Sequence, residues 1–143
     1  MAGTRDMADQ IQFELVSPER LLLSEPVEMV VVPGVEGDFG VLPGHAPLVS
    51  TVRPGVIAVF EGGKVVQRIF VARGFAEVTG ERCTVLAEQA MPVADIDRAA
   101  VEVEIREARD DLSEAKDDAE RARLEFRIAA AEAKLAALDN PVY

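Results

Sequence analysis

The sequence predicts two parts of different class: an antiparallel β-sandwich, or flattened barrel, followed by an antiparallel hairpin of two α-helices. Glycine and proline, which interrupt helices, are almost confined to the first part. All 10 glycines lie at or before Gly80, and all but one of the 8 prolines lie at or before Pro92. Short apolar runs fill this part, whereas the later residues repeat at helical spacing. We expect a disordered leader at residues 1–9, a sandwich at 10–90 and helices at 95–139.

The first predicted strand, residues 10–15, alternates polar and apolar side chains, which places Ile11, Phe13 and Leu15 on one face. Further apolar runs of strand length predict strands at residues 21–23, 27–32, 56–60, 65–71, 75–78 and 84–87. Tight turns are expected at residues 61–64 and 78–82, where glycine supplies a positive φ. Short strands with no helical pattern between them indicate an antiparallel sandwich.

The stretch from Pro33 to Leu48 holds four glycines and three prolines. This composition predicts a rigid looped path with Glu36 and Asp38 near its tip. Two interpretations stay open from composition alone. The stretch is either a long structural connection between strands or a loop that carries a functional contact.

Helical periodicity takes over after residue 94. One apolar stripe recurs at spacings of three and four residues from Val101 to Ala136, and a second runs from Leu124 to Leu138. Asp95 is expected to cap the first helix, and the polar stretch 113–118 to break the rod, with Asp117 or Asp118 capping a second helix. Asn140 and Pro141 would end it. A rod of 45 residues either folds back as a hairpin or extends towards a partner.

The composition excludes several function classes. With 26 acidic against 15 basic side chains the formal charge is −11, which disfavours nucleic-acid binding. One cysteine, Cys83, and one histidine, His45, make neither a disulfide nor a Cys/His metal cluster. The protein has no Gly-x-Ser-x-Gly, no Gly-Lys-Ser/Thr and no apolar run of membrane-spanning length. We therefore expect no catalytic residue, no metal, no cofactor and no membrane insertion.

Residues 34–48, Gly-Val-Glu-Gly-Asp-Phe-Gly-Val-Leu-Pro-Gly-His-Ala-Pro-Leu, resemble the signature stretch of the epsilon subunit of F-type ATP synthases, equivalent to the mitochondrial delta subunit. The likeness extends to residues 13–20, 53–55 and 71–78 and to Ile96-Asp97, and it covers residues 10 to about 138. It implies a non-catalytic rotor subunit in the central stalk. The implied partners are the gamma subunit, the c-ring of the membrane sector and the alpha/beta catalytic head.

The resemblance also implies site residues. Glu36, Gly37 and Asp38 correspond to the loop that contacts the c-ring, with Asp38 matching an acidic position of that contact. The residues expected to fix the shape of this stretch are Gly40, Pro43, Gly44 and His45. A lone histidine such as His45 is more often structural than functional.

The helical tail is the regulatory element in the family, where it opposes ATP hydrolysis by extending into the catalytic head. Arg121, Arg123 and Arg127 are candidates for inhibitory contacts with a beta subunit. The alternative is that they are solvated charges of one helix face, with Asp117–Arg121 and Glu120–Arg123 as intrahelical pairs. Both interpretations stay open.

Some family members bind ATP through the motif Ile-Asp-x-x-Arg-Ala. This sequence keeps Ile96 and Asp97, but Ala100 stands where the arginine belongs and Arg98 lies two residues early. On a helix this displaces the guanidinium by about 200°. We therefore expect weak or absent ATP binding.

The resemblance implies a peripheral position on the cytoplasmic face of a bacterial inner membrane, with a mitochondrial matrix or thylakoid location less favoured. A different class of function also stays open. The protein would then be a stand-alone β-sandwich binding module with a coiled-coil dimerisation tail.

Overall fold

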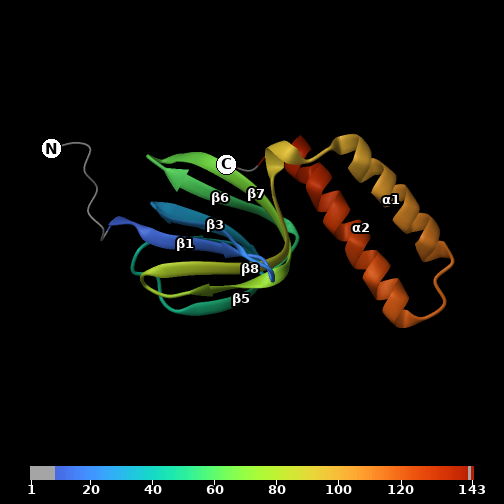
Figure 1. The fold of residues 1–143 in the computed structure, drawn as a ribbon, viewed down its shortest axis with the longest axis horizontal. Coiled ribbons are helices and arrows are strands. Elements are labelled where there is room, and N and C mark those ends of the chain that lie inside the picture. Colours follow the sequence, from blue (N-terminus) through green and yellow to red (C-terminus); the bar gives the residue numbers. More distant parts are fainter. Residues whose placement is uncertain (1–8, 142) are drawn as a thin grey trace. The chain divides into compact units, whose positions relative to one another are not determined.

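The structure, a computed structural model, describes residues 9–141 and residue 143 (Figure 1). These residues form two compact units: one extends to Pro92 and includes Tyr143, and the other begins at Val93. Except for Asp9, the predicted leader at residues 1–9 lies outside the described residues.

The first unit is built from strands, which we label in chain order. They are β1 (Ile11–Val16), β2 (Leu21–Val27), β3 (Met29–Gly34), β4 (Gly37–Val41), β5 (Leu48–Val52), β6 (Gly55–Glu61), β7 (Lys64–Val78) and β8 (Arg82–Pro92).

The two longest strands, β7 and β8, pair with each other along most of their length and connect the two layers of the sandwich. The first half of β7 pairs with β6, which continues to β3 and β4, whereas its second half pairs with β5. On the other side, β8 pairs with β1 and β1 with β2. The strand pairs in the described residues are antiparallel except β1 with β8, which is parallel. The sequence did not indicate this parallel pair.

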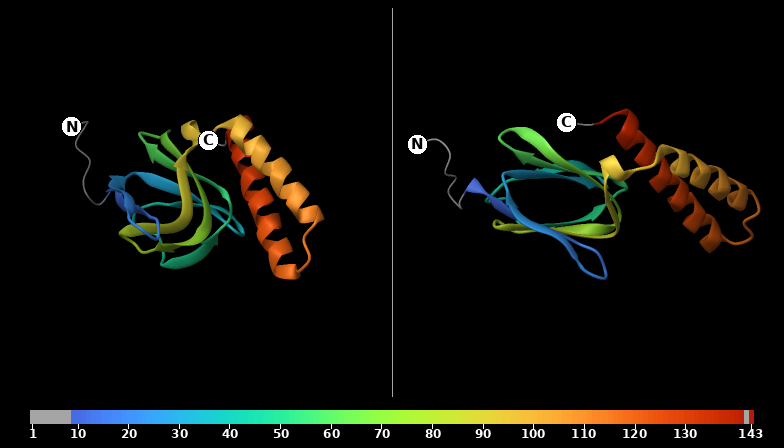
Figure 2. Two further views of the ribbon diagram at one scale, coloured as in Figure 1. Left: turned by 45° about the vertical axis from the view of Figure 1, so that its right-hand side comes forward. Right: turned by 45° about the horizontal axis from the view of Figure 1, so that its top comes forward.

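The strands enclose one apolar core, around which they wrap in Figure 2. The alternation predicted for the first strand is confirmed, because Ile11, Phe13 and Leu15 are buried and the residues between them are not. The core cluster consists of Ile11, Phe13, Leu15, Val27, Val30, Val32, Val41, Val52, Ile57, Val59, Ile69, Val71, Ala76, Val78, Cys83, Val85 and Ala87.

Residues 65–71 and 75–78, predicted as separate strands, are parts of the single strand β7. The residues between them adapt the strand to a close approach of β8. A Cβ on Gly74 would lie 1.8 Å from the Leu86 carbonyl oxygen, so no side chain fits there. Arg73 beside it has a φ of 60°. Gly74 therefore permits one continuous strand where two were predicted.

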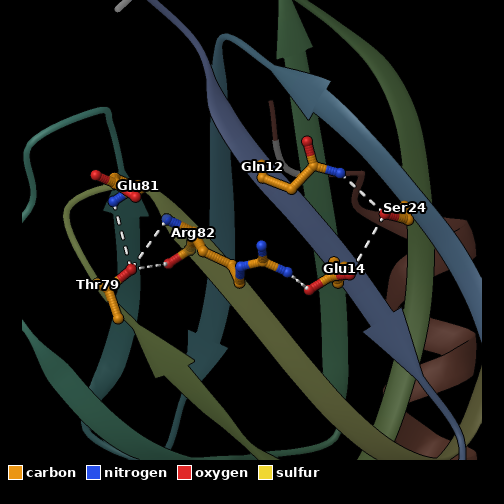
Figure 3. A network of polar contacts seen from close by, with 6 residues as sticks. All are labelled: Gln12, Glu14, Ser24, Thr79, Glu81 and Arg82. Atoms are coloured by element: carbon orange, nitrogen blue, oxygen red, sulfur yellow. Dashed lines mark hydrogen bonds and ion pairs between the residues drawn. The ribbon is translucent and has the colours of Figure 1, made fainter.

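Both predicted tight turns are present, but they are built differently. In the β6–β7 turn, Gly62 and Gly63 have φ values of 60° and 74°, as a two-residue hairpin turn requires. In the β7–β8 turn, Gly80 has no positive φ, so that part of the prediction is wrong. Thr79 shapes this turn instead: its Oγ1 accepts hydrogen bonds from the backbone N–H of Arg82 at 3.1 Å and of Glu81 at 3.4 Å (Figure 3).

A polar network fastens β1 to both of its neighbours (Figure 3). Glu14 on β1 forms an ion pair with Arg82 on β8, and its carboxylate also accepts a hydrogen bond from the Ser24 hydroxyl on β2. Gln12 donates to the same hydroxyl oxygen at 2.9 Å. These contacts fix the register of the parallel pair at the end where β8 begins.

The predicted looped path over residues 33–48 is wrong for most of its length. Strand β3 continues through Gly34, and β4 begins at Gly37, so a short hairpin replaces the loop. The glycines do not prevent pairing because strand ladders use the backbone. Pro33 can lie within β3 although it has no backbone N–H to donate. Its carbonyl oxygen accepts a hydrogen bond from the backbone N–H of Arg53 at 2.9 Å. Residues 42–47 alone remain as a loop before β5.

The second unit begins with a 3-10 turn (η2, Val93–Asp95), followed by the helices α1 (Arg98–Ser113) and α2 (Asp118–Asp139), which pack on each other. The expected break and stop are confirmed, because the helices are interrupted at residues 114–117 and α2 ends before Asn140. Asp117 caps α2, accepting from the backbone N–H of Glu120 at 2.7 Å. The cap of α1 is Asp97, not Asp95, because Asp95 lies within the preceding 3-10 turn.

The first apolar stripe holds in α1, where Val101, Ile105 and Ala108 are buried, but fails in α2. Ala119, Ala122 and Ala129 of that stripe are exposed. Residues 114–117 are not helical, so the three- and four-residue spacing does not continue across them and the first stripe does not lie on the same side of α2. The second stripe supplies the buried side of α2 instead. The buried residues of α2 are Leu124, Ala130 and Ala131.

Ion pairs between the described helices include Arg98–Asp139, Glu104–Arg127 and Arg109–Glu132. All are solvent-accessible, so each adds little to the small apolar contact of an alanine-rich pair. Neither described helix is long and apolar enough to cross a membrane.

Candidate functional site

The candidate site is the turn that joins β3 and β4, which holds Glu36 and is followed by Gly37 and Asp38. Its backbone depends on glycine at both ends. Gly37 has a φ of 134°, which residues with a side chain rarely adopt. A Cβ on Gly34 would lie 2.9 Å from the Gly37 carbonyl oxygen and 3.0 Å from the Phe39 ring. The two glycines therefore allow a narrow turn between β3 and β4.

Arg53, just after β5, clamps this turn from the side. Its guanidinium donates through Nη1 to the Gly34 carbonyl oxygen and through Nη2 to Asp38 Oδ1, both at 2.5 Å. Two backbone bonds add to this: Val35 N–H donates to Thr51 O at 3.0 Å, and Arg53 N–H donates to Pro33 O. The planar fork of arginine suits two acceptors in one plane. The turn is thus held rigidly to the end of β5.

The two acidic residues of the turn differ in their surroundings. Asp38 is engaged on both carboxylate oxygens: Oδ1 with Arg53, and Oδ2 as acceptor from the Tyr143 hydroxyl at 2.9 Å. Glu36 is exposed, and its side chain makes no hydrogen bond or ion pair with the described residues. Glu36 is therefore the acidic group that a partner meets without first displacing an internal contact.

The residues expected to fix the stretch lie in β4 and in the following loop. Gly44 has a φ of 84°, and its N–H donates to the Gly80 carbonyl at 2.8 Å, which ties the loop to the β7–β8 turn. His45 N–H donates to Leu42 O, and its Nδ1 lies 2.6 Å from the Ala46 carbonyl oxygen. Pro43 lines a hollow of about 510 Å³ with Gly44 and residues of the β7–β8 turn. A Cβ on Gly40 would make only an ordinary contact with Met29, so the fold does not demand glycine there.

The three candidate arginines of the tail are not equivalent. Arg127 pairs with Glu104 of α1 at 3.2 Å, and Arg121 donates to the Ala115 carbonyl at 3.3 Å in the turn between the helices. Arg123 is exposed and makes no side-chain hydrogen bond or ion pair with the described residues. The intrahelical pairs Asp117–Arg121 and Glu120–Arg123 do not form in the part of the protein that the structure describes. The structure therefore leaves Arg123 as the most available cation of the three.

The residues of the incomplete nucleotide motif have structural roles. Ile96 is buried, and Asp97 Oδ1 accepts from the backbone N–H of Ala100 as the cap of α1. Arg98 is paired with Asp139, and the hydrogen bond and charge of that carboxylate raise the pKa of Arg98 above its ordinary value.

A hollow of about 510 Å³ lies between the two helices. It is lined by two arginines, Arg106 and Arg109, against three carboxylates, Glu102, Glu132 and Asp139. Arg109 already pairs with Glu132. Arg98 adds a third arginine through its ion pair with Asp139, so the charges around this hollow balance, and weak or absent ATP binding stays a prediction.

Sequence reasoning missed Arg53 and Tyr143 as partners of Asp38. A signal for Arg53 was present, because it is the only residue of type Asp, Glu, Lys or Arg between Asp38 and Glu61. A single cation in an apolar stretch needs an acceptor nearby. Tyr143 gave no such signal, because it is more than 100 residues away from Asp38.

The fold and this site define a class of two-part proteins: a β-sandwich with an acidic β3–β4 turn, followed by a pair of antiparallel helices. The family model described as "ATP synthase, Delta/Epsilon chain, beta-sandwich domain" matches residues 10–93. A second family model, which describes the C-terminal domain of the ATP synthase epsilon chain, matches residues 97–141. The protein belongs to the epsilon-chain family of ATP synthases.

Curated relatives and solved structures agree with this assignment. The ATP synthase epsilon chain of Rhodospirillum rubrum is 64% identical over 104 residues, which cover 73% of this chain and 78% of that one. The epsilon chain of Paramagnetospirillum magneticum is 58% identical over the same shares.

Among solved structures, a chain of the Euglena gracilis mitochondrial ATP synthase OSCP/F1/c-ring complex is 30% identical with a TM-score of 0.78. The match covers 96% of this chain and 87% of that chain. A subunit from the central stalk and c-ring of the Tetrahymena thermophila mitochondrial ATP synthase shares the fold, with a TM-score of 0.59, 14% identity, and coverage of 89% and 95%.

Proposed function

We propose that this protein is a non-catalytic central-stalk subunit of an ATP synthase, and that it couples c-ring rotation through the gamma subunit to ATP synthesis in the catalytic head. The observation that carries the proposal is the match of both parts of the sequence, in order, to the two epsilon-chain family models. The relative in the Euglena gracilis complex was solved together with F1 and the c-ring.

The β3–β4 turn is the proposed c-ring contact. A rotor must transmit torque without slipping, so its contact should be stiff, and the Arg53 clamp supplies stiffness. Glu36 extends from this turn with its carboxylate free of other described side chains. We assign Glu36 the direct contact with polar or cationic groups of the ring, and Asp38 the role of holding the turn through Arg53. Gly37 allows the turn its backbone path.

The helical hairpin is the proposed regulatory element, which opposes ATP hydrolysis through contacts with the alpha/beta head. The helices are held to each other by a small apolar contact and exposed ion pairs, so separating them costs little. Arg123 is available for an acidic partner at once, whereas Arg127 becomes available only when its pair with Glu104 breaks. We place the protein peripherally on the cytoplasmic face of a bacterial inner membrane, without insertion.

The alternative of a stand-alone module with a coiled-coil dimerisation tail has less support. A dimerising coiled coil needs a continuous apolar stripe along one long helix. Here the stripe is interrupted at residues 114–117, and the two helices of one molecule pack on each other.

The experiment replaces the protein in its own assembled complex. Asp38→Lys and Glu36→Lys complexes are purified beside a Glu19→Lys control, which makes the same charge change in the exposed β1–β2 turn. We expect gamma to co-purify with all three variants, and the c-ring to be lost or uncoupled only in the two β3–β4 variants. A complex lacking residues 95–143 should keep the ring and hydrolyse ATP faster. Equal behaviour of all three lysine variants would contradict the assignment of the turn, and unchanged hydrolysis would contradict the inhibitory role of the tail.

A further inference from the structure

Tyr143 belongs to the sandwich unit, although the segment that precedes it, residues 93–142, forms the other unit. Its side chain is about half exposed, at 51%, and lies on residues of three different strands. These are Asp38 of β4, Phe60 of β6 and Arg68 of β7. We call these three residues the tyrosine seat.

The seat contacts the ring, the hydroxyl and the backbone carbonyl of Tyr143, each by a different kind of interaction. The ring meets Phe60 edge to face, with centroids 5.8 Å apart and planes at 73°, an arrangement that the aromatic quadrupoles favour. The hydroxyl donates to Asp38 Oδ2 at 2.9 Å. Arg68 Nη2 donates to the Tyr143 carbonyl oxygen at 2.5 Å. The ring and hydroxyl contacts together favour tyrosine over other residues, whereas the Arg68 contact is to a backbone carbonyl that any residue has.

We propose that Tyr143 is a latch, which binds the tyrosine seat and so tethers the carboxyl end of helix α2 to the sandwich. Helix α2 ends at Asp139, so only three residues separate it from the latch. The segment from Val93 is already joined to β8 at its other end. A closed latch therefore holds the tail segment at both ends, and an open latch leaves it attached only through residues 92–93.

The seat shares Asp38 with the Arg53 clamp. Asp38 Oδ1 accepts from Arg53 and Oδ2 from Tyr143, so opening the latch frees one carboxylate oxygen beside the β3–β4 turn. If that turn contacts the c-ring, the latch connects the state of the tail with the charge presented to the ring. This consequence rests on the proposed function, whereas the latch itself does not.

The protein carries its own probe for the test, because Tyr143 is its single tyrosine and it has no tryptophan. The near-ultraviolet absorbance of tyrosinate thus reports one phenol. Burial, the hydrogen bond to Asp38 and the Asp38 charge raise the Tyr143 pKa, and the nearby Arg53 charge opposes them. Arg68 is the other charged group of the seat. For the isolated protein we expect the Tyr143 phenol to titrate above the ordinary value of about 10.

Asp38→Asn and Phe60→Ala should both lower this pKa towards about 10. Phe75→Ala, which removes an exposed aromatic of β7 outside the seat, should leave it unchanged. Circular dichroism at each pH restricts the comparison to the folded protein. A wild-type phenol that titrates at its ordinary value, and does not respond to Asp38→Asn, would overturn the latch.

Hydrogen exchange of the backbone amides of residues 136–140 supplies a second readout, which a change confined to the sandwich would not move. Tyr143→Ala should speed this exchange about tenfold, since an aromatic pair and a hydrogen bond are lost together. Tyr143→Phe, which keeps the ring contact, should give a smaller increase. Equal exchange in the wild type and in Tyr143→Ala would overturn the proposal. Both readouts use the isolated protein, so they can fail while the central-stalk assignment stands.

Discussion

Replacing Arg53 by alanine removes the clamp from the β3–β4 turn and should destabilise the sandwich by about 2 kcal/mol. A hydrogen bond from a charged donor contributes about 1.5–3 kcal/mol, and Arg53 makes one to the carbonyl of the buried Gly34. The ion pair with Asp38 adds about 0–1 kcal/mol, because the two side chains are 41% and 30% exposed. Because the Arg53 and Asp38 side chains are partly exposed, we expect the combined loss of the two contacts to lie towards the lower end of these ranges.

Urea unfolding of the isolated protein measures this difference, and Arg20→Ala is the matched control. Arg20 lies in the exposed β1–β2 turn, and its side chain makes no hydrogen bond or ion pair with the described residues, so its loss should stay within about 0.5 kcal/mol. A double-mutant cycle with Asp38→Ala isolates the ion pair, for which we expect a coupling of about 0.5–1 kcal/mol. If Arg53→Ala is no more destabilising than Arg20→Ala, the turn is not held by Arg53 and the stiffness argument fails.

Three further predictions concern the fold. Gly74→Ala should destabilise the protein by about 3 kcal/mol or more in urea unfolding, because the new methyl meets the Leu86 carbonyl; a loss below about 1 kcal/mol would show that β8 moves away easily. Asp97→Ala should cost about 1 kcal/mol of helix stability by circular dichroism, whereas Asp95→Ala should cost almost nothing; equal effects would refute the assigned cap. Burial raises the Cys83 pKa from 9.0 to about 12. The unfolded thiol ionises first, so stability should fall between those pH values, and less so in Cys83→Ala; equal alkaline losses would contradict this.

Much of the sandwich could be predicted because its signals are local. The alternation of residues 11–15 follows from one buried face, and the Gly62-Gly63 pair specifies a hairpin turn by its own backbone preference. The end of α1 and the N-terminal cap of α2 could also be predicted from the sequence. Asp117 directly precedes a helical pattern, where a side-chain acceptor satisfies a free N–H.

The errors came from positions where tertiary contacts override local preference. Composition suggested a loop at residues 33–41. The strands β3 and β4 nevertheless pair through their backbone hydrogen bonds, which their glycines can form as well as any other residue. The first apolar stripe was extended through residues 114–117 as if they were helical, so Ala119, Ala122 and Ala129 were wrongly expected to be buried, whereas the second stripe does supply buried residues. Tyr143 comes from a distant segment, so no local pattern reveals it as a partner of Asp38, whereas Arg53 gave a signal as the one charged side chain of an apolar stretch.

The central claim is that the β3–β4 turn faces the c-ring, and a cross-link at residue 36 tests it most directly. Cys83 is buried and its thiol pKa is raised, so a cysteine introduced by Glu36→Cys is the reactive thiol at neutral pH. Coupling it to a photoactivatable group in the assembled complex should yield an adduct with the ring subunit, while Glu19→Cys in the β1–β2 turn yields none. Adducts with the ring from Glu19→Cys but not from Glu36→Cys would contradict the account.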